Sequence, residues 1–141
     1  AIRAEVLGEK HPDYATSLNN LASLYQKMGL FEKAEPLYLE AKAIRAEVLG
    51  EKHPDYATSL HTLASLYQKV GSFEKAEPLC LEAKAIAAEV LREKHPDYAM
   101  SLNNLAVVYQ QMGSFEKAEP LYLEAKAIRA EVLGEKHPDY A

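Results

Sequence analysis

The sequence reads His-Pro-Asp-Tyr-Ala at residues 11–15, and the same five residues return at 53–57, 95–99 and 137–141, each time 42 residues later. The unit that begins at residue 11 matches the second unit at 35 of 42 positions and the third at 37. A fixed period of this length is typical of solenoids, in which each unit buries its apolar surface against its neighbours. The repeat therefore predicts an array and not one irregular core.

The period divides the 141 residues into one array with incomplete units at both ends. Residues 127–141 are identical to residues 1–15, so the chain is expected to open with the end of one unit and to close with the start of another. The predicted organisation is a partial repeat at 1–10, full repeats at 11–52, 53–94 and 95–136, and the start of a fourth repeat at 137–141.

Each full unit is expected to form two helices joined by a short turn. Pro12 suits the first turn of a helix, apolar residues follow at helical spacing, and Gly29 suits a left-handed stop, which predicts a first helix over 12–28. The same spacing resumes after the turn and predicts a second helix over 31–49. Pro36 lies inside that helix, where we expect a local kink but no break.

The second helix carries two apolar faces on a helical wheel, separated by charged positions such as Arg45. The main face contains Ala34, Leu37, Ala41, Ile44 and Val48, and the narrower one contains Leu39, Ala43 and Ala46. We expect one face to pack on the first helix of the same unit and the other on the next unit.

The order of small and large residues resembles the tetratricopeptide repeat. The matching positions are Leu18, Leu21, Ala22, Tyr25, Gly29, Ala34, Tyr38 and Ala41. The 42-residue period, Leu-Asn-Asn-Leu-Ala at 18–22 and Glu-Lys-Ala-Glu-Pro-Leu-Tyr at 32–38 are more specifically similar to the repeats of kinesin light chains and nephrocystin. The resemblance implies an all-α, right-handed superhelical solenoid of antiparallel helix pairs, whose first helices line a concave groove that binds other proteins.

Composition excludes several other classes of function. The formal net charge of −5 argues against binding to nucleic acid or to anionic lipid, both of which require clustered basic residues. No stretch approaches the 18 or so apolar residues of a membrane span. Cys80 is the only cysteine, so no intrachain disulfide is possible and a cytoplasmic location is expected.

No motif in the sequence predicts catalysis, and neither a cofactor nor a metal is expected. The His-Pro-Asp element recurs in every unit, which favours helix initiation over a metal or acid–base site. Cys80 stands where Tyr38 and Tyr122 stand in the other units, and we expect a buried, unreactive thiol. His61 replaces an asparagine and is interpreted as a groove or surface residue.

The first helices have a charge asymmetry, since no acidic residue occurs in 14–31, 56–73 or 98–115 although the chain has 21. Their polar sides carry amides and hydroxyls, which suit the backbone groups of an extended peptide. A solvated face of an amphipathic helix is the competing interpretation. The predicted peptide-binding groove comprises Thr16, Asn19, Asn20, Ser23, Gln26, Lys27, Thr58, His61, Thr62, Ser65, Gln68, Lys69, Met100, Asn103, Asn104, Val107 and Gln110.

The third unit departs from this polar pattern. Met100 and Val107 replace Thr16 and Ser23 of the first unit. Either an apolar pocket for a ligand side chain forms there, or a neighbouring repeat covers both residues.

Two functions follow from these expectations. The first is a scaffold for protein–protein interaction that binds an extended peptide or a partner helix in its groove. The alternative is a structural spacer or self-associating repeat module with no dedicated ligand. In both cases the incomplete units at the two ends predict head-to-tail self-association, because inner repeats bury surface against both neighbours.

Overall fold

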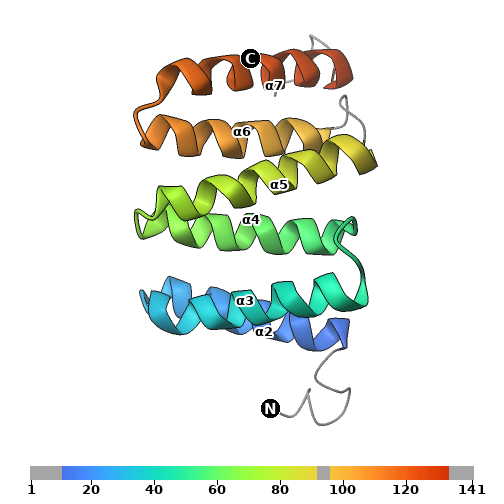
Figure 1. Ribbon diagram of the computed structural model, residues 1–141, viewed down its shortest axis with the longest axis vertical. Helices are drawn as coiled ribbons and strands as arrows, with labels where there is room; N and C mark the ends of the chain where they lie inside the picture. The colour runs from blue at the N-terminus through green and yellow to red at the C-terminus, as the bar shows by residue number, and fades with distance from the viewer. Residues whose placement is uncertain (1–10, 92–95, 134–141) are drawn as a thin grey trace. The chain divides into compact units, whose positions relative to one another are not determined.

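The computed structural model describes residues 11–91 and 96–133, which form six α-helices (Figure 1). The chain divides into two compact units, residues 1–71 and 72–141. The first unit contains α2 (Pro12–Lys27), α3 (Phe31–Val48) and α4 (Pro54–Lys69), and the second contains α5 (Phe73–Leu91), α6 (Pro96–Gln111) and α7 (Phe115–Leu133). The all-α prediction is confirmed, and the two predicted helices of the first repeat end within one residue of α2 and α3. None of these six helices has the length and apolarity that crossing a bilayer requires.

The His-Pro-Asp element begins two of the helices. His11 has an extended backbone, and its Nδ1 accepts a hydrogen bond of 3.0 Å from the backbone N–H of Asp13. His53 caps α4 with the same 3.0 Å bond from Asp55. Each proline takes the first helical position, where a missing N–H costs nothing. The structural interpretation of this element is therefore confirmed at both caps.

Glycine ends α2 as expected. Gly29 has a φ of 80°, and the N–H of Leu30 reaches back to the carbonyl of Tyr25 at 2.8 Å. Together with the 3.0 Å bond from Gly29 to Gln26, this is the Schellman pattern that satisfies the last carbonyls of a helix. Pro36 lies within α3, which continues through it unbroken.

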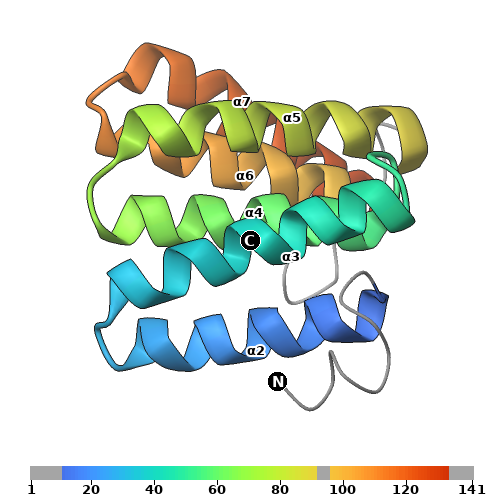
Figure 2. The same ribbon diagram turned by 60° about the horizontal axis from the view of Figure 1, so that its bottom comes forward.

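In the first unit, α3 packs against both α2 and α4, and it lies between them in Figure 2. Ala15 and Leu18 of α2 meet Ala41 and Ile44 of α3 in a buried cluster. The alanines lack side-chain bulk, so the two backbones approach closely and exclude water from the aliphatic groups. This cluster holds the first helix pair together.

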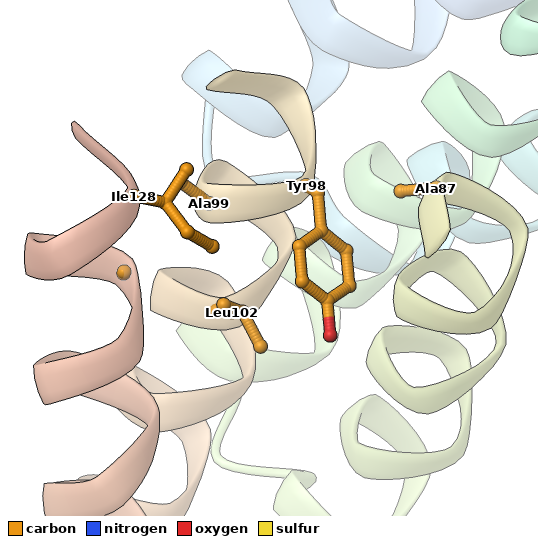
Figure 3. Close-up of a cluster of buried hydrophobic side chains, with 6 residues drawn as sticks. Ala87, Tyr98, Ala99, Leu102 and Ile128 are labelled. Atoms are coloured by element: carbon orange, nitrogen blue, oxygen red, sulfur yellow. The ribbon is translucent and has the colours of Figure 1, made fainter. Parts of the chain in front are cut away.

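The second unit has a corresponding core where α5, α6 and α7 meet (Figure 3). Tyr98, Ala99 and Leu102 of α6 are buried together with Ala87 of α5 and Ile128 of α7. Helix α6 thus contacts both of its neighbours in this unit.

The predicted two-faced character of the second helix is only partly right. Ala34, Ala41 and Ile44 of the main face are buried, but Val48 at its end is exposed. The narrower face is wrong, because Leu39 and Ala43 are exposed and Ala46 is only half-buried. Its place on the buried side of α3 is taken by two polar side chains, Tyr38 and Arg45.

Arg45 is the largest departure from the sequence interpretation, since only 6% of this residue is exposed. Its Nη1 donates to Ser59 Oγ at 2.9 Å and to the Asp55 carbonyl at 3.3 Å, and its Nη2 donates to Thr16 Oγ1 at 3.3 Å. Burial lowers the pKa of Arg45, and the nearby Asp55 carboxylate opposes that shift. A planar guanidinium can satisfy three acceptors from two helices at once. Arg45 therefore links α3 to both α2 and α4.

The equivalent positions in the later repeats differ. In α5 the residue is Ala87, which packs in the apolar cluster with Tyr98. Ser101 keeps the bond to the Asp97 carbonyl of its own helix, at 3.2 Å, that Ser59 also makes to Asp55, at 3.3 Å. In α7 it is Arg129, whose Nη1 and Nη2 donate at 2.7 and 3.0 Å to Asn103 Oδ1 in the amide orientation that satisfies both groups. The same repeat position thus makes three different sets of contacts, and it is buried at Arg45 and Ala87 but half-buried at Arg129.

Candidate functional site: a polar surface on the first helices

The predicted groove residues share one property, which is that none of them is buried. The exposed ones are Thr16, Asn20, Lys27, Thr58, Lys69, Met100, Val107 and Gln110. The half-buried ones are Asn19, Ser23, Gln26, His61, Thr62, Ser65, Gln68, Asn103 and Asn104. The polar sides of α2 and α4 in the first unit, and that of α6 in the second unit, are each accessible to a ligand.

Six of these residues come together in a hollow of about 230 Å³ in the first unit. Helix α2 supplies Ser23, Gln26 and Lys27, and helix α4 supplies Thr62, Ser65 and Lys69. The seventh residue of the lining is Tyr38 of α3, which was expected only as a large packing residue. Amide, hydroxyl and ammonium groups from three helices therefore converge on one small space.

Tyr38 forms the inner wall of this hollow. Only 4% of it is exposed, and its hydroxyl donates a hydrogen bond of 2.9 Å to Gln26 Oε1. Burial raises the pKa of Tyr38, against the opposite effect of a hydrogen bond with Ser23, so the hydroxyl stays protonated near neutral pH. Because Oε1 of Gln26 is engaged as an acceptor, its amide hydrogens are left as donors toward a ligand.

The same pair recurs in the second unit, where the Tyr122 hydroxyl donates to Gln110 Oε1 at 2.9 Å. Phe115, Glu116, Ala118, Glu119 and Leu123 complete the lining of a more open hollow of about 450 Å³ beside this pair. The tyrosine–glutamine pair is thus a repeated device that fixes one amide of the predicted groove. A sequence signal existed for it, since both residues keep the same 12-residue separation in the two units.

The charged side chains that line the hollow in the first unit are all basic. Lys27 and Lys69 line it, and no carboxylate belongs to its lining. The nearest helix segments in sequence, 14–31 and 56–73, contain no acidic residue at all. The hollow therefore offers two ammonium groups and several neutral donors and acceptors to a ligand.

Other predicted groove residues are partly engaged within the protein. Thr58 Oγ1 donates to the Pro54 carbonyl at 3.1 Å, and Thr62 Oγ1 donates to the Ser59 carbonyl at 3.0 Å. Asn103 is held by Arg129, and Thr16 accepts from Arg45. Asn19 differs, because its Oδ1 is buried without a hydrogen-bond partner in the described part of the chain. The polar face therefore has a structural role besides any role in binding.

Met100 and Val107 are exposed on α6. Both alternatives for these residues, an apolar pocket for a ligand side chain and coverage by a neighbouring repeat, stay predictions. They are two accessible apolar side chains on the side of α6 that also carries Asn103, Asn104 and Gln110.

The surroundings of Cys80 and of the possible metal-binding side chains do not favour reactivity. Cys80 is buried, and burial, followed by the charge of Glu77, raises the pKa of its thiol to about 11. A thiol of this kind is protonated and shielded, so the prediction of a buried cysteine is confirmed. Within residues 11–91 and 96–133, no group of three or more histidine, cysteine or acidic side chains is placed to hold a metal ion.

A third hollow was not anticipated from the sequence. It has a volume of about 510 Å³ and lies where the turn before α3 faces the end of α4. Its lining is Gly29, Leu30, Phe31, Glu32, Lys33, Glu35, Leu66, Tyr67 and Val70. The Tyr67 hydroxyl donates to Glu35 Oε2 at 2.6 Å across it, so this hollow belongs to the packing interface of α3 and α4.

Consecutive helix pairs with a polar face on their first helices define a class of helical-repeat proteins. The tetratricopeptide repeat signature matches residues 1–44, 13–77, 57–131 and 99–141, so the chain belongs to the tetratricopeptide repeat family. A search among curated proteins found no match.

Solved structures with similar folds include two of the kinesin light chain type. One is BtubC (BKLC) from P. vanneervenii, with 32% identity, a TM-score of 0.86, and coverage of 97% of this chain and 54% of that one. Another is a putative kinesin light chain from Podosopora anserina with nearly identical repeats, with 35% identity, a TM-score of 0.85, and coverage of 99% and 66%. The chain therefore spans between half and two thirds of these relatives and resembles kinesin light chain-like repeats. The N-terminal domain of stress-induced protein-1 from C. elegans shares the fold alone, at 17% identity and a TM-score of 0.66 over 92% of this chain and 90% of that one.

Proposed function

We propose that this chain is a non-catalytic scaffold that binds an extended peptide or a partner helix along the polar face of α2, α4 and α6. The observation that carries the proposal is the hollow of about 230 Å³, where six predicted groove residues from two repeats meet around Tyr38. Tetratricopeptide repeats are in general protein-interaction modules, which supports the class of ligand. The buried, protonated Cys80 thiol and the single-cysteine composition favour a cytoplasmic setting.

The chemistry of the hollow suits a peptide ligand. Ser23 and Ser65 each offer a donor and an acceptor, and Gln26 offers amide hydrogens, so backbone carbonyl and N–H groups both find partners. Lys27 and Lys69 add attraction for carbonyl oxygens or acidic groups of the ligand. An extended chain lying across α2 and α4 would contact both sides of the hollow at once.

The test begins with selection of binding peptides by display against the full chain. For a selected peptide, Ser65→Ala combined with Lys69→Ala is expected to weaken affinity by about tenfold or more in titration calorimetry, because each loses a polar contact. Lys84→Ala, a lysine of α5 outside the polar face, is the control and should leave affinity unchanged. Equal affinity for all variants, with helicity preserved by circular dichroism, would remove the hollow from the binding site.

The second candidate function is self-association of the repeat array without a dedicated ligand. It is favoured by the exposed apolar side chains Leu24 and Met28 on α2 and Phe115 on α7. Failure of every peptide library to yield a reproducible motif, together with concentration-dependent assembly of the chain, would support this function over the first.

A further inference from the structure

The hollow of about 510 Å³ between the start of α3 and the end of α4 has the size of a small-molecule site. We call it the α3–α4 hollow. Its lining includes the apolar side chains Leu30, Phe31 and Val70. Leu30 and Phe31 are half-buried and Val70 is 44% exposed, so the packing of α3 on α4 leaves apolar surface open here. The α3–α4 hollow shares no lining residue with the polar hollow around Tyr38, and it is therefore a separate site.

The charged side chains of the α3–α4 hollow favour a cation. Glu35 is half-buried, and its Oε2 accepts the 2.6 Å hydrogen bond from the Tyr67 hydroxyl, which fixes the carboxylate without neutralising its charge. Glu32 adds a second carboxylate to the lining. The ammonium group of Lys33 lies 5.7 Å from the centroid of the Tyr25 ring, a cation–π contact with a residue outside the lining. Carboxylates therefore outnumber ammonium groups in this lining, and one carboxylate lies beside apolar side chains.

Leu30 is an unusual residue for its position in the repeat. It is the N-cap of α3 and makes no side-chain capping bond. Ser72 and Ser114 stand at the same position before α5 and α7, and all three carbonyls accept two backbone bonds of 3.1 Å from the following helix. Serine is among the preferred N-cap residues, whereas leucine is among the poorest. The first repeat thus lacks a good helix cap at this position and has an apolar side chain in the α3–α4 hollow instead.

We propose that the α3–α4 hollow binds a small organic cation, in which an aromatic ring or a short alkyl chain carries an ammonium group. The ammonium group donates to the Glu35 carboxylate, which the Tyr67 hydroxyl holds in place. The apolar part of the ligand lies against Leu30, Phe31 and Val70, and its removal from water supplies the affinity. The ion pair fixes the orientation of the ligand, as the few polar groups of a mostly apolar site do.

The experiment is a titration of the full, isotope-labelled chain with naphthylmethylammonium, followed by the amide shifts in NMR spectra. Naphthylmethanol, which has the same shape and no charge, is the comparison ligand. The shifts should move and saturate at residues 29–35 and 66–70, which contain the lining. The alcohol should bind about tenfold more weakly than the ammonium probe, because it forms no ion pair with Glu35.

The charge of Glu35 is tested with a matched pair of variants. Glu35→Gln keeps an oxygen for the Tyr67 hydroxyl and removes the charge, so it should weaken binding of the ammonium probe about tenfold and leave binding of the alcohol unchanged. Glu77→Gln is the control, since Glu77 is hydrogen-bonded to Tyr109 in the second unit just as Glu35 is to Tyr67. This control should leave the affinity of both ligands unchanged.

Leu30→Ser separates a role in binding from a role in folding. It introduces the residue of the other two repeats, so it should raise the midpoint of urea unfolding by improving the cap of α3. It should also weaken binding of both ligands by about threefold, because part of the apolar wall is lost. A more stable variant that binds less tightly cannot owe its loss of affinity to unfolding.

Four results would each overturn the proposal. They are no saturable shifts at all, shifts on the polar sides of α2 and α4 in place of the α3–α4 hollow, equal affinity for the ammonium probe and the alcohol, and unchanged affinity in Glu35→Gln. None of them bears on the peptide-binding proposal, because the two hollows have no lining residue in common.

Discussion

Arg45 Nη1 of α3 and Ser59 Oγ of α4 form a hydrogen bond of 2.9 Å, and both residues are buried. The guanidinium also bonds to Thr16 of α2, so one side chain connects three helices of the first unit. Hydrogen bonds to a buried charge are costly to remove, because the partners lose their bonds without regaining contact with water.

We expect Arg45→Ala to lower the free energy of unfolding by about 1–3 kcal/mol, because Ser59 and Thr16 lose their donor. Arg45→Lys should restore only part of this loss, since a single ammonium group cannot reproduce the fork of the guanidinium. Arg129→Ala is the control for removal of the same side chain at a half-buried position, and its effect should be smaller. Urea unfolding followed by circular dichroism measures all three, and equal losses at positions 45 and 129 would contradict the role of burial.

Leu63 of α4 and Leu21 of α2 occupy equivalent positions, so truncating each to alanine compares the same change at a buried and at an exposed site. Leu63 is 1% exposed and Leu21 is 41% exposed. Leu63→Ala should cost roughly 2–5 kcal/mol of unfolding free energy, and Leu21→Ala should cost much less, because an exposed side chain leaves no cavity. Thermal and urea unfolding compare the two, and similar losses would mean that their surroundings are alike.

Tyr67 predicts a dependence of stability on alkaline pH. Burial first, and then the hydrogen bond and charge of Glu35, raise the pKa of Tyr67 from 10.0 to about 12. The folded state keeps this proton while the unfolded state loses it, so the stabilisation is fully present below the ordinary pKa and is lost as the pH rises toward the folded value. The stability difference between the original chain and Tyr67→Phe should therefore be largest near neutral pH and shrink above about pH 10. A difference that grows with pH would contradict the raised pKa.

Cys80 predicts a thiol that reports on unfolding. Its pKa of about 11 and its burial leave almost no accessible thiolate at neutral pH. An aromatic disulfide reagent should react slowly with the folded chain and rapidly in urea, and the slow rate should track unfolding. Rapid stoichiometric reaction without denaturant would show that the α5 surface opens readily.

The sequence predicted the structural features that recur in every repeat, but it predicted poorly the surroundings of positions where the repeats differ. Periodicity, the proline at the helix start and the glycine stops predicted both helices of the first repeat to within one residue, because these signals act locally. Arg45 was assigned to a charged boundary between two faces, since hydropathy alone treats arginine as a solvent-facing residue. Its burial depends on acceptors from α2 and α4, which are far from it in sequence. The presence of alanine at position 87 was an available sign that this position lies inside.

The candidate site shows the same division. All predicted groove residues are accessible, which follows from the amphipathic pattern of each helix. The hollow and the part that Tyr38 plays in it depend on three helices meeting, and no pattern within one helix contains that information.

The exchange of Arg45 for Ala87 at equivalent positions has a consequence for how such an array diverges after duplication. Copies that look alike from solvent are distinguished at their inner contacts, where one junction is polar and another is apolar. Ser101 and Asp97 stand where Ser59 and Asp55 stand one repeat earlier, so acceptors for an arginine at position 87 are already present in the sequence. Recombination between neighbouring copies would then exchange a polar inner contact for an apolar one without removing the partners of either, so near-identical units can trade segments and keep their fold.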